Sequence, residues 1–349
     1  MKVAALSYPV FAQVQGGLEI HILESIAALR ALGCEIRLVD LTHEKLADFD
    51  LVHVFAAGCG NHQMVRYARL VGTPAVLSPL IQPCWNRALG RRARLLDRLV
   101  GRLTRWEVST EYRDLHAALS GADRVVALGA LEKTHIVDAF EIDPARVSVI
   151  PNGIPPRFFD ADPAPFLERF GLQPGFVLCV GSIDEHKNQL GLAQALAGSG
   201  RTLVLVGYCS GPNQPYLDRV LQVPSTRHIG GLPYDDPLLA SAYAAAGVFV
   251  LASRSEVMPL VVLEALAAGT PVVMTRHHGM DTSQLQQVLI EVDPHSPQAI
   301  GRAVARQFSN PPSRQDCVAA VRHLTWGAVA NSLLEVYEGV LRERAARKP

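Results

Sequence analysis

Two carboxylates lie on either side of a proline in the segment Ser255–Val273, which reads SEVMPLVVLEALAAGTPVV. Glu264 lies inside an almost unbroken apolar run, whereas Glu256 precedes Pro259. A carboxylate among Leu, Val and Ala is costly to bury unless a hydrogen-bonding partner satisfies it. The pair could therefore hold a polar ligand. The ordinary alternative is that Glu264 pairs with a core arginine or caps a backbone group.

The residues around these carboxylates predict where each one lies. Val248–Ala252 is typical of a buried strand, and Pro259 suits the first position of a helix that we expect over Leu260–Ala268. Gly269 suits the position just past the end of that helix. Glu256 is thus predicted in the loop after the strand, and Glu264 in the second helical turn. Ligands of open parallel sheets bind at such strand ends, beside helix N-termini.

Two further loops have residues suited to phosphate binding. The loop Gln15-Gly16-Gly17 precedes a predicted helix, and its glycines would let the backbone approach a ligand closely. The loop Gly181–Asn188 carries Lys187 beside another predicted helix start, where it could neutralise phosphate. A plain loop and a solvated lysine are the ordinary alternatives. The sequence contains neither G-x-G-x-x-G nor G-x-x-x-x-G-K-[ST], which disfavours a standard dinucleotide or P-loop site.

Short apolar runs alternate with helical patterns along the chain, which predicts parallel sheets covered on both faces. We expect strands near residues 3–7, 36–39, 51–55, 75–78, 124–128 and 147–150, then 176–180, 202–206, 228–229 and 248–252. A proline-rich stretch from Pro151 to Pro165 separates the two sets. The prediction is two doubly wound α/β domains facing each other across a cleft, over residues 1–160 and 161–325. Residues 326–349 are expected to form a closing amphipathic helix.

Composition limits the class of protein. The chain has 349 residues, 49% of them hydrophobic, and its 33 basic and 33 acidic side chains cancel, which argues against a general nucleic-acid binder. The 6 cysteines form no C-x-x-C pair and are expected to be reduced thiols of a cytosolic protein. The N-terminal apolar run is too short for a signal peptide. No apolar run is long enough to span a membrane.

The opening segment resembles the E-x7-E motif of retaining glycosyltransferases of the GT-B fold (family 4-like, "glycosyl transferases group 1"). The match runs from Ser253 through Glu256, Pro259 and Glu264 to Gly269 and Pro271. Other segments are similar to family motifs in the same order. They are Gly16–His21 (G-G-x-E-x-H), Val149–Ile154 (V-I-P-N-G-[VI]), Gly181–Asn188 (G-[RS]-x-x-x-x-K-N) and the tail around Trp326–Leu341.

The resemblance implies a role for each matched residue. Glu264 would accept hydrogen bonds from the donor ribose, Glu256 would contact the donor sugar near the reacting carbon, and Lys187 would neutralise the diphosphate. The other donor-binding residues would be Gly16, Gly17, Ser182, Gly207, Leu232 and the backbone N–H groups of Leu260 and Val261. The tail helix would pack back on the N-terminal domain. No metal and no cofactor besides the nucleotide-sugar would be required.

Three departures from the family pattern concern the site. Val257 stands where relatives usually have glycine, and Ser182 where many have an arginine that contacts the diphosphate. Arg254 could supply that charge instead. Many relatives also have a histidine just after the strand that corresponds to Ala75–Ser78, which this chain lacks. The expected acceptor-side residues are therefore Glu19, His21, Ser78 and, as a further candidate, His116.

Residues 87–105, RALGRRARLLDRLVGRLTR, contain seven arginines and a single acid, Asp97. Leu89, Leu96, Leu99 and Leu103 recur at helical spacing. A basic amphipathic helix favours contact with an acidic membrane surface, and the acceptor could then be lipid-linked. The ordinary alternative is a solvated helix face.

The sequence therefore predicts a retaining, metal-independent glycosyltransferase that moves a sugar from a nucleotide-sugar to a saccharide or lipid-linked acceptor. The expected setting is bacterial cell-surface polysaccharide, lipopolysaccharide or glycolipid synthesis, in the cytoplasm or on the inner face of the cytoplasmic membrane. Two alternatives are a nucleotide-sugar epimerase of the same fold and a non-catalytic protein that binds nucleotide-sugars.

Overall fold

The computed structural model of the chain describes residues 1–13 and 16–347. It consists of two compact units, residues 1–153 with 326–349 and residues 154–325. The sequence analysis placed the first boundary at residue 160. The proline-rich stretch instead belongs to the second unit from Ile154 onward, because Phe158 is fully buried in that unit's core.

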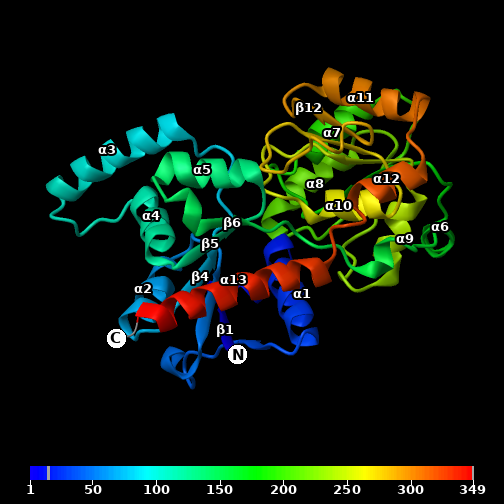
Figure 1. The fold of residues 1–349 in the computed structure, drawn as a ribbon. Helices are drawn as coiled ribbons and strands as arrows, with labels where there is room; N and C mark the ends of the chain where they lie inside the picture. Colours follow the sequence, from blue (N-terminus) through cyan, green and yellow to red (C-terminus); the bar gives the residue numbers. More distant parts are fainter. Residues whose placement is uncertain (14–15, 348–349) are drawn as a thin grey trace. The chain divides into compact units, whose positions relative to one another are not determined.

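The first unit is a parallel six-stranded sheet with strand order β2-β1-β3-β4-β5-β6 (Figure 1). Its strands are short and mostly buried, as expected when helices cover both faces. They span Lys2–Leu6 (β1), Glu35–Leu38 (β2), Leu51–Phe55 (β3), Ala75–Ser78 (β4), Arg124–Ala127 (β5) and Val147–Val149 (β6). Its helices span Gly17–Ala31 (α1), His62–Leu70 (α2), Arg87–Leu103 (α3), Glu111–Gly121 (α4), Ala130–Phe140 (α5) and Trp326–Arg347 (α13).

The second unit repeats this architecture with strand order β12-β11-β10-β7-β8-β9, again all parallel. Its strands span Val177–Val180 (β7), Leu203–Val206 (β8), Thr226–His228 (β9), Val248–Leu251 (β10), Val272–Thr275 (β11) and Leu289–Val292 (β12). Its helices span Ala164–Phe170 (α6), Gln189–Leu196 (α7), Gln214–Leu221 (α8), Pro237–Ala245 (α9), Leu260–Ala267 (α10), Pro297–Ser309 (α11) and Arg314–Val321 (α12).

Both units have the doubly wound α/β architecture that the alternating pattern predicts. The strand order reverses between β1 and β3 in the first unit and between β7 and β10 in the second. Loops at such reversal points diverge to opposite faces of the sheet and leave room for a ligand at the carboxyl ends of the strands. None of the described helices is both long and apolar enough to cross a bilayer.

The C-terminal helix α13 packs against α1 in the first unit (Figure 1). Its Tyr337 is fully buried, and the Tyr337 hydroxyl lies 2.6 Å from Nδ1 of His53 in β3. The chain comes back to the first unit at Trp326, close to Gly153. A glycine is needed there, since a Cβ atom would lie 2.5 Å from the backbone nitrogen of Trp326. Lys348 and Pro349, the last residues of the predicted closing segment, lie outside the described residues.

Candidate functional site

The reversal point of the second sheet carries the residues that the sequence singled out. Strands β7 and β10 are neighbours there, and Lys187 and Glu256 lie in the loops that follow them. Nζ of Lys187 lies 2.7 Å from Oε1 of Glu256, and both side chains are largely buried. The Lys187 side chain runs past Gly181, where a Cβ atom would lie 3.6 Å from its Cε. A cation and a carboxylate therefore meet where this fold class binds ligands.

Asp184 shapes the loop after β7. Its Oδ1 accepts a hydrogen bond from the backbone N–H of Lys187 at 2.9 Å, and its Oδ2 accepts one from the hydroxyl of Ser182 at 2.6 Å. Ser182 replaces the arginine of many relatives, and its hydroxyl has this internal partner. Asp184 was not among the predicted site residues, although an aspartate in a loop that leads into a helix is a common turn residue.

The loop after β10 is held from two sides. The backbone N–H of Arg254 donates to the carbonyl of His186, which ties it to the loop after β7. On the other side, the backbone N–H of Glu256 donates to His277, and that of Gly279 donates to the carbonyls of Glu256 and Val257. The path of the chain at Val257 is thus fixed by the segment after β11, without a glycine at that position.

Helix α10 begins directly after this loop. Pro259 is its N-cap with extended backbone, one position earlier than the sequence analysis placed it, and Leu260 and Val261 are its first two residues. Their backbone N–H groups lie in the first helical turn, where N–H groups have no intrahelical acceptor. The positive end of the helix dipole is therefore on the same side of the second unit as Lys187.

Glu264 lies in the second turn of α10 with 2% of its surface exposed. The Tyr243 hydroxyl donates to its Oε2 at 2.9 Å. Burial, followed by the neighbouring Glu264, holds the pKa of Tyr243 well above its usual range, so the phenol stays a donor. The family resemblance implies that a bound ligand satisfies this carboxylate. The protein itself supplies a partner, from a helix that precedes Glu264 in the chain.

Two residues predicted to contact the nucleotide are Gly207, at the end of β8, and Leu232, in the segment after β9. Gly207 cannot carry a side chain, since a Cβ atom there would lie 1.8 Å from the carbonyl oxygen of Gly181. Leu232 is half-buried against the core of the second unit. Between them, the ring of the half-exposed Tyr208 covers Gly231.

In the first unit, the loop after β1 leads into α1. Gly16 is the helix N-cap with extended backbone, and Gly17 is the first helical residue, where a Cβ atom would have no neighbour within 4 Å among the described residues outside its own helix. Glu19 lies in the first helical turn. Gln15, which the sequence analysis grouped with the two glycines, lies outside the described residues.

The acceptor-side candidates His21 and Ser78 are both buried. Nδ1 of His21 lies 2.7 Å from Oδ1 of Asn152, and the Ser78 hydroxyl lies 2.9 Å from Nε2 of His53. Burial lowers the pKa of His21 to about 4 and that of His53 to about 3. Both imidazoles are therefore neutral near pH 7. Together with Tyr337 they form a buried polar cluster that links β3, β4, α1 and α13.

His116 lies apart from this cluster, on α4. Its ring stacks on Tyr112 with centroids 5.9 Å apart, and burial together with Arg94 lowers its pKa. The sequence analysis missed His53, whose position in the middle of an apolar strand gives no sign of a hydrogen-bonding role. Its proximity to Ser78 follows from the neighbouring strands β3 and β4.

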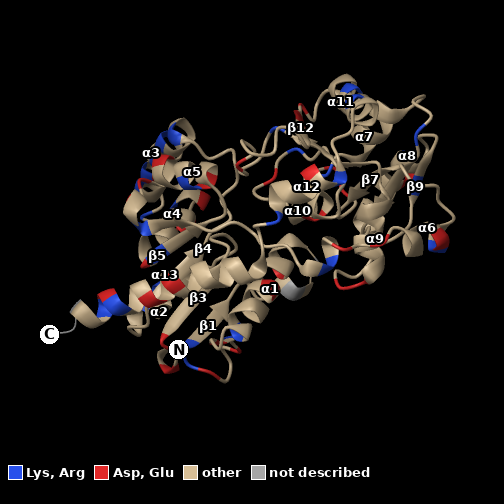
Figure 2. Cartoon of the chain, turned by 45° about the vertical axis from the view of Figure 1, so that its right-hand side comes forward, with Lys and Arg blue, Asp and Glu red and all other residues tan. Residues whose placement is uncertain are grey.

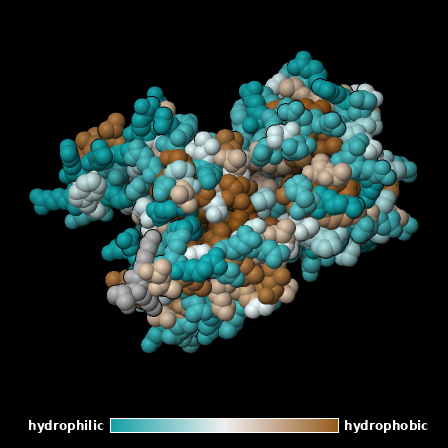
Figure 3. Space-filling model, in the orientation of Figure 1, coloured by the Kyte–Doolittle hydropathy of each residue, from teal (hydrophilic) through white to brown (hydrophobic). Residues whose placement is uncertain are grey.

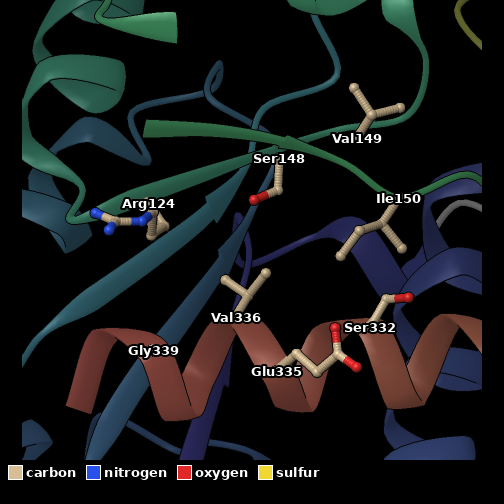
Figure 4. Close-up of a pocket in the computed structure, with 8 residues that line it drawn as sticks. All are labelled: Arg124, Ser148, Val149, Ile150, Ser332, Glu335, Val336 and Gly339. Atoms are coloured by element: carbon tan, nitrogen blue, oxygen red, sulfur yellow. The ribbon is translucent and has the colours of Figure 1, made fainter. Parts of the chain in front are cut away.

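A hollow in the first unit lies between the edge strand β6 and α13 (Figure 4). Ser332 and Glu335 on the helix point toward the strand, and Arg124 lies at one end. The predicted site residues do not line it. Apart from Gly16 and Gly17, which belong to the first unit, the predicted donor-side residues lie in the loops and in helix α10 at the carboxyl end of the second sheet.

Comparison with known proteins shows which family this chain resembles. Residues 164–324 match the family model described as glycosyl transferases group 1. The D-inositol 3-phosphate glycosyltransferase of Thermomonospora curvata is 32% identical over 250 residues, which cover 63% of this chain and 58% of that protein. The chain thus aligns with somewhat more than half the length of this relative.

Solved structures share the fold over nearly the whole chain. Sucrose-phosphate synthase from Thermosynechococcus elongatus superposes with a TM-score of 0.76 at 18% identity, covering 98% of this chain and 100% of that one. Anabaena Alr3699/HepE, solved in complex with UDP-glucose, superposes with a TM-score of 0.72 at 14% identity, covering 97% of this chain and 100% of that one. The GT-B fold that the motifs predicted is confirmed.

Proposed function

We propose that this chain, whose residues 164–324 match the glycosyl transferases group 1 family model, transfers a sugar from a nucleotide-sugar to an acceptor hydroxyl with retention of configuration. The observation that carries the proposal is the Lys187–Glu256 pair at the reversal point of the second sheet, beside the N-terminus of α10. Its relative from Thermomonospora curvata is named a glycosyltransferase, and HepE was solved with UDP-glucose. A uridine nucleotide is therefore the first donor to test.

Each donor-side residue suits a different part of the nucleotide-sugar. Lys187 and the first N–H groups of α10 present positive charge to the diphosphate, which becomes more negative as it leaves. Glu264, held by Tyr243, accepts hydrogen bonds from the ribose hydroxyls. Glu256 accepts hydrogen bonds from hydroxyls of the donor sugar. Lys187 must then exchange Glu256 for phosphate, or contact both, when the donor binds.

The reaction breaks the bond between the anomeric carbon and the diphosphate oxygen and forms one to the acceptor oxygen on the same face of the sugar. The residues named above stabilise the leaving diphosphate without a metal. The acceptor would be received by the first unit, as the family resemblance implies.

Helix α3 supports a further part of the proposal, namely contact with an acidic membrane surface. Its protein-facing side consists of Gly90, Asp97 and Gly101. A Cβ atom at Gly90 would lie 2.3 Å from the carbonyl oxygen of Ala139 in α5, so the helix packs with its small residues inward. The leucines consequently point outward, with Leu103 exposed to 76% and Leu95, Leu96 and Leu99 each exposed by more than half.

Arginines border these exposed leucines. Figure 2 shows Lys and Arg positions in blue along the ribbon of α3, and Figure 3 shows hydrophobic and hydrophilic residues together in that part of the surface. Arg94 forms an ion pair with Glu141, whereas Arg91, Arg98 and Arg102 are exposed and have no ion pair within the described part of the chain. Exposed leucines insert among acyl chains while arginines bind anionic headgroups. This surface fits a lipid-linked acceptor and a role in cell-surface glycan or glycolipid synthesis.

The test begins with a thermal-shift panel of nucleoside diphosphates, since a ligand that binds only the folded state raises its stability. Release of the nucleotide from nucleotide-sugars, with and without acceptor, then measures turnover. Glu264→Gln should weaken binding of the best nucleotide by about tenfold through loss of charged hydrogen bonds. Glu168→Gln, at an exposed position of the same unit, is the matched control.

Three outcomes would count against the proposal. Unchanged nucleotide affinity in Glu264→Gln would remove the site assignment. Binding without turnover would favour the non-catalytic alternative, and conversion of the donor to its epimer would favour the epimerase.

A further inference from the structure

Glu132 joins two separate segments at the carboxyl edge of the first sheet. It lies in the first turn of α5 with 1% of its surface exposed. Its Oε2 accepts a hydrogen bond from the backbone N–H of Leu128, just after β5, at 2.6 Å. Its Oε1 accepts one from the backbone N–H of Ile81, just after β4, at 2.7 Å. One buried carboxylate therefore satisfies a backbone donor from each of two adjacent strand ends.

The segment after β4, residues 79–86, needs such an anchor. Leu80 has a φ of 55°, a left-handed conformation that is unfavourable for a branched side chain. The hydrogen bond that the backbone N–H of Ile81 donates to Glu132 holds the residue that follows Leu80. Strained backbone of this kind persists only where its surroundings fix it, and it occurs often at functional sites.

Helix α5 also holds the far end of this segment. Trp85 is buried, and its ring lies 4.8 Å from the ring of Phe140, centroid to centroid. Phe140 is the last residue of α5, and Glu132 lies in its first turn. The two ends of the loop, Ile81 and Trp85, are thus fixed to the same helix.

Gln82 and Cys84 are exposed between these two anchors. They lie just beyond the carboxyl end of β4, on the edge where parallel α/β sheets bind ligands. A short loop fixed at both ends presents its exposed side chains in one position, which lowers the entropy cost of binding.

We propose that Glu132 is a positioning residue that fixes the loop of residues 79–86, and that Gln82 in this loop contacts the acceptor. The second half of this inference rests on the proposed glycosyltransferase function, whereas the anchoring role does not. Glutamate suits the task because its two oxygens accept from two N–H groups. A glutamine would turn one amide N–H₂ group toward an N–H donor and leave that donor without a partner.

Hydrogen–deuterium exchange of the full chain tests the anchor without any substrate. In Glu132→Gln, amides of residues 80–86 should exchange about tenfold faster than in the wild type, as expected from one lost buried hydrogen bond. Amides of the second unit should be unchanged. Glu111→Gln, an exposed glutamate in the first turn of α4, is the matched control. Equal exchange in Glu132→Gln and wild type would overturn the anchor.

Kinetics tests the acceptor contact, with UDP-glucose as donor and D-inositol 3-phosphate as the first acceptor probe. Glu132→Gln and Gln82→Ala should each raise KM for the acceptor about tenfold, while the Kd for UDP stays unchanged. An unchanged acceptor KM in an active Gln82→Ala enzyme would overturn the contact. If the wild type turns over none of the donors and acceptors of a wider panel, the proposed function and the acceptor contact fail together, and exchange still decides the anchor.

Discussion

The ammonium group of Lys187 and the carboxylate of Glu256 are 2.7 Å apart although 69 positions separate them in the chain. The pair joins the loops after two neighbouring strands, β7 and β10. Each charge offsets the other before any ligand arrives. A diphosphate that binds here as proposed would therefore compete with Glu256 for Lys187.

This competition predicts opposite effects of two substitutions. Lys187→Met should weaken UDP binding by about 10-fold to 100-fold, the loss expected for a hydrogen bond to a charged group. Glu256→Gln should strengthen UDP binding several-fold, because it frees the lysine and removes a nearby negative charge, yet it should lower turnover. Isothermal titration calorimetry measures both affinities. Weaker UDP binding in both variants would mean that the Lys187–Glu256 ion pair only holds the two loops in place and does not compete with the diphosphate.

Tyr243→Phe should destabilise the second unit. The substitution removes the hydroxyl that donates to the buried Glu264, and loss of one such bond costs about 1–3 kcal/mol. Urea denaturation monitored by circular dichroism measures the change. Tyr208→Phe, at a half-exposed ring, should change the free energy of unfolding by less than about 0.5 kcal/mol. Equal effects of the two substitutions would contradict the role of Tyr243.

Two glycines inside helices of the first unit should respond oppositely to alanine. At Gly90 the new Cβ atom would lie 2.3 Å from a backbone oxygen, and such overpacking costs about 1–3 kcal/mol. At Gly339 in α13 no atom lies within 4 Å of the new Cβ, so alanine should stabilise the helix by about 0.5–1 kcal/mol. Thermal unfolding of both variants checks the prediction. Stabilisation by Gly90→Ala would show that α3 does not pack on α5 as described.

Glu132 should give the first unit a pH-dependent stability. Burial raises the pKa of Glu132 to about 7 despite its two amide hydrogen bonds, whereas an unfolded glutamate has a value near 4.5. Between these values the folded state binds the proton more tightly. The contribution of Glu132 to the free energy of unfolding is therefore fully present below about pH 4.5. It is lost as pH rises through 7, by about 3 kcal/mol in total.

The comparison that isolates this contribution is wild type against Glu132→Gln from pH 5 to 8. The difference in free energy of unfolding should shift steadily against the wild type as pH rises. The lowered pKa values of His21 and His53 make stability rise with pH, the opposite of the Glu132 effect. Because both proteins contain these histidines, their contributions cancel in the difference. A constant difference across this range would show that Glu132 has an ordinary pKa.

Leu99→Glu should weaken binding to vesicles that contain phosphatidylglycerol by about tenfold or more, since it removes a membrane-inserting side chain and repels anionic lipid. Leu70→Glu is the matched control, because Leu70 is exposed to 78% on α2, outside the basic helix. Vesicle flotation measures the bound fraction. Equal flotation of the two variants, or wild-type binding that does not depend on phosphatidylglycerol, would contradict the membrane contact.

Much of the fold could be predicted because buried parallel strands appear as continuous apolar runs. Residues 51–55 and 75–78 were predicted as strands with the bounds that the structure has. Strands β11 and β12 were not separated in advance, because β11 follows the apolar helix α10 almost without a polar break. The loops with Lys187 and Glu256 were found through glycine, proline and charge at strand ends.

The partners of these residues could not be predicted, because tertiary contacts leave no local pattern. Tyr243 appears in the sequence as an ordinary core aromatic of α9, and only folding brings its hydroxyl to Glu264. Helix α3 gives the clearest case. Its periodicity predicted an amphipathic helix correctly, but periodicity cannot tell which face is inward, and here the glycines and Asp97 take that side.

The first unit is built from both ends of the chain, with the whole second unit between them. During synthesis, residues 154–325 can therefore be complete and folded while the first sheet still lacks the helix that carries Tyr337. His53 can reach its partner Tyr337 only after residues 326–347 have left the ribosome. A nascent chain stopped near residue 325 would present a folded second unit together with an unfinished first unit, and a chaperone would find its target in residues 1–153.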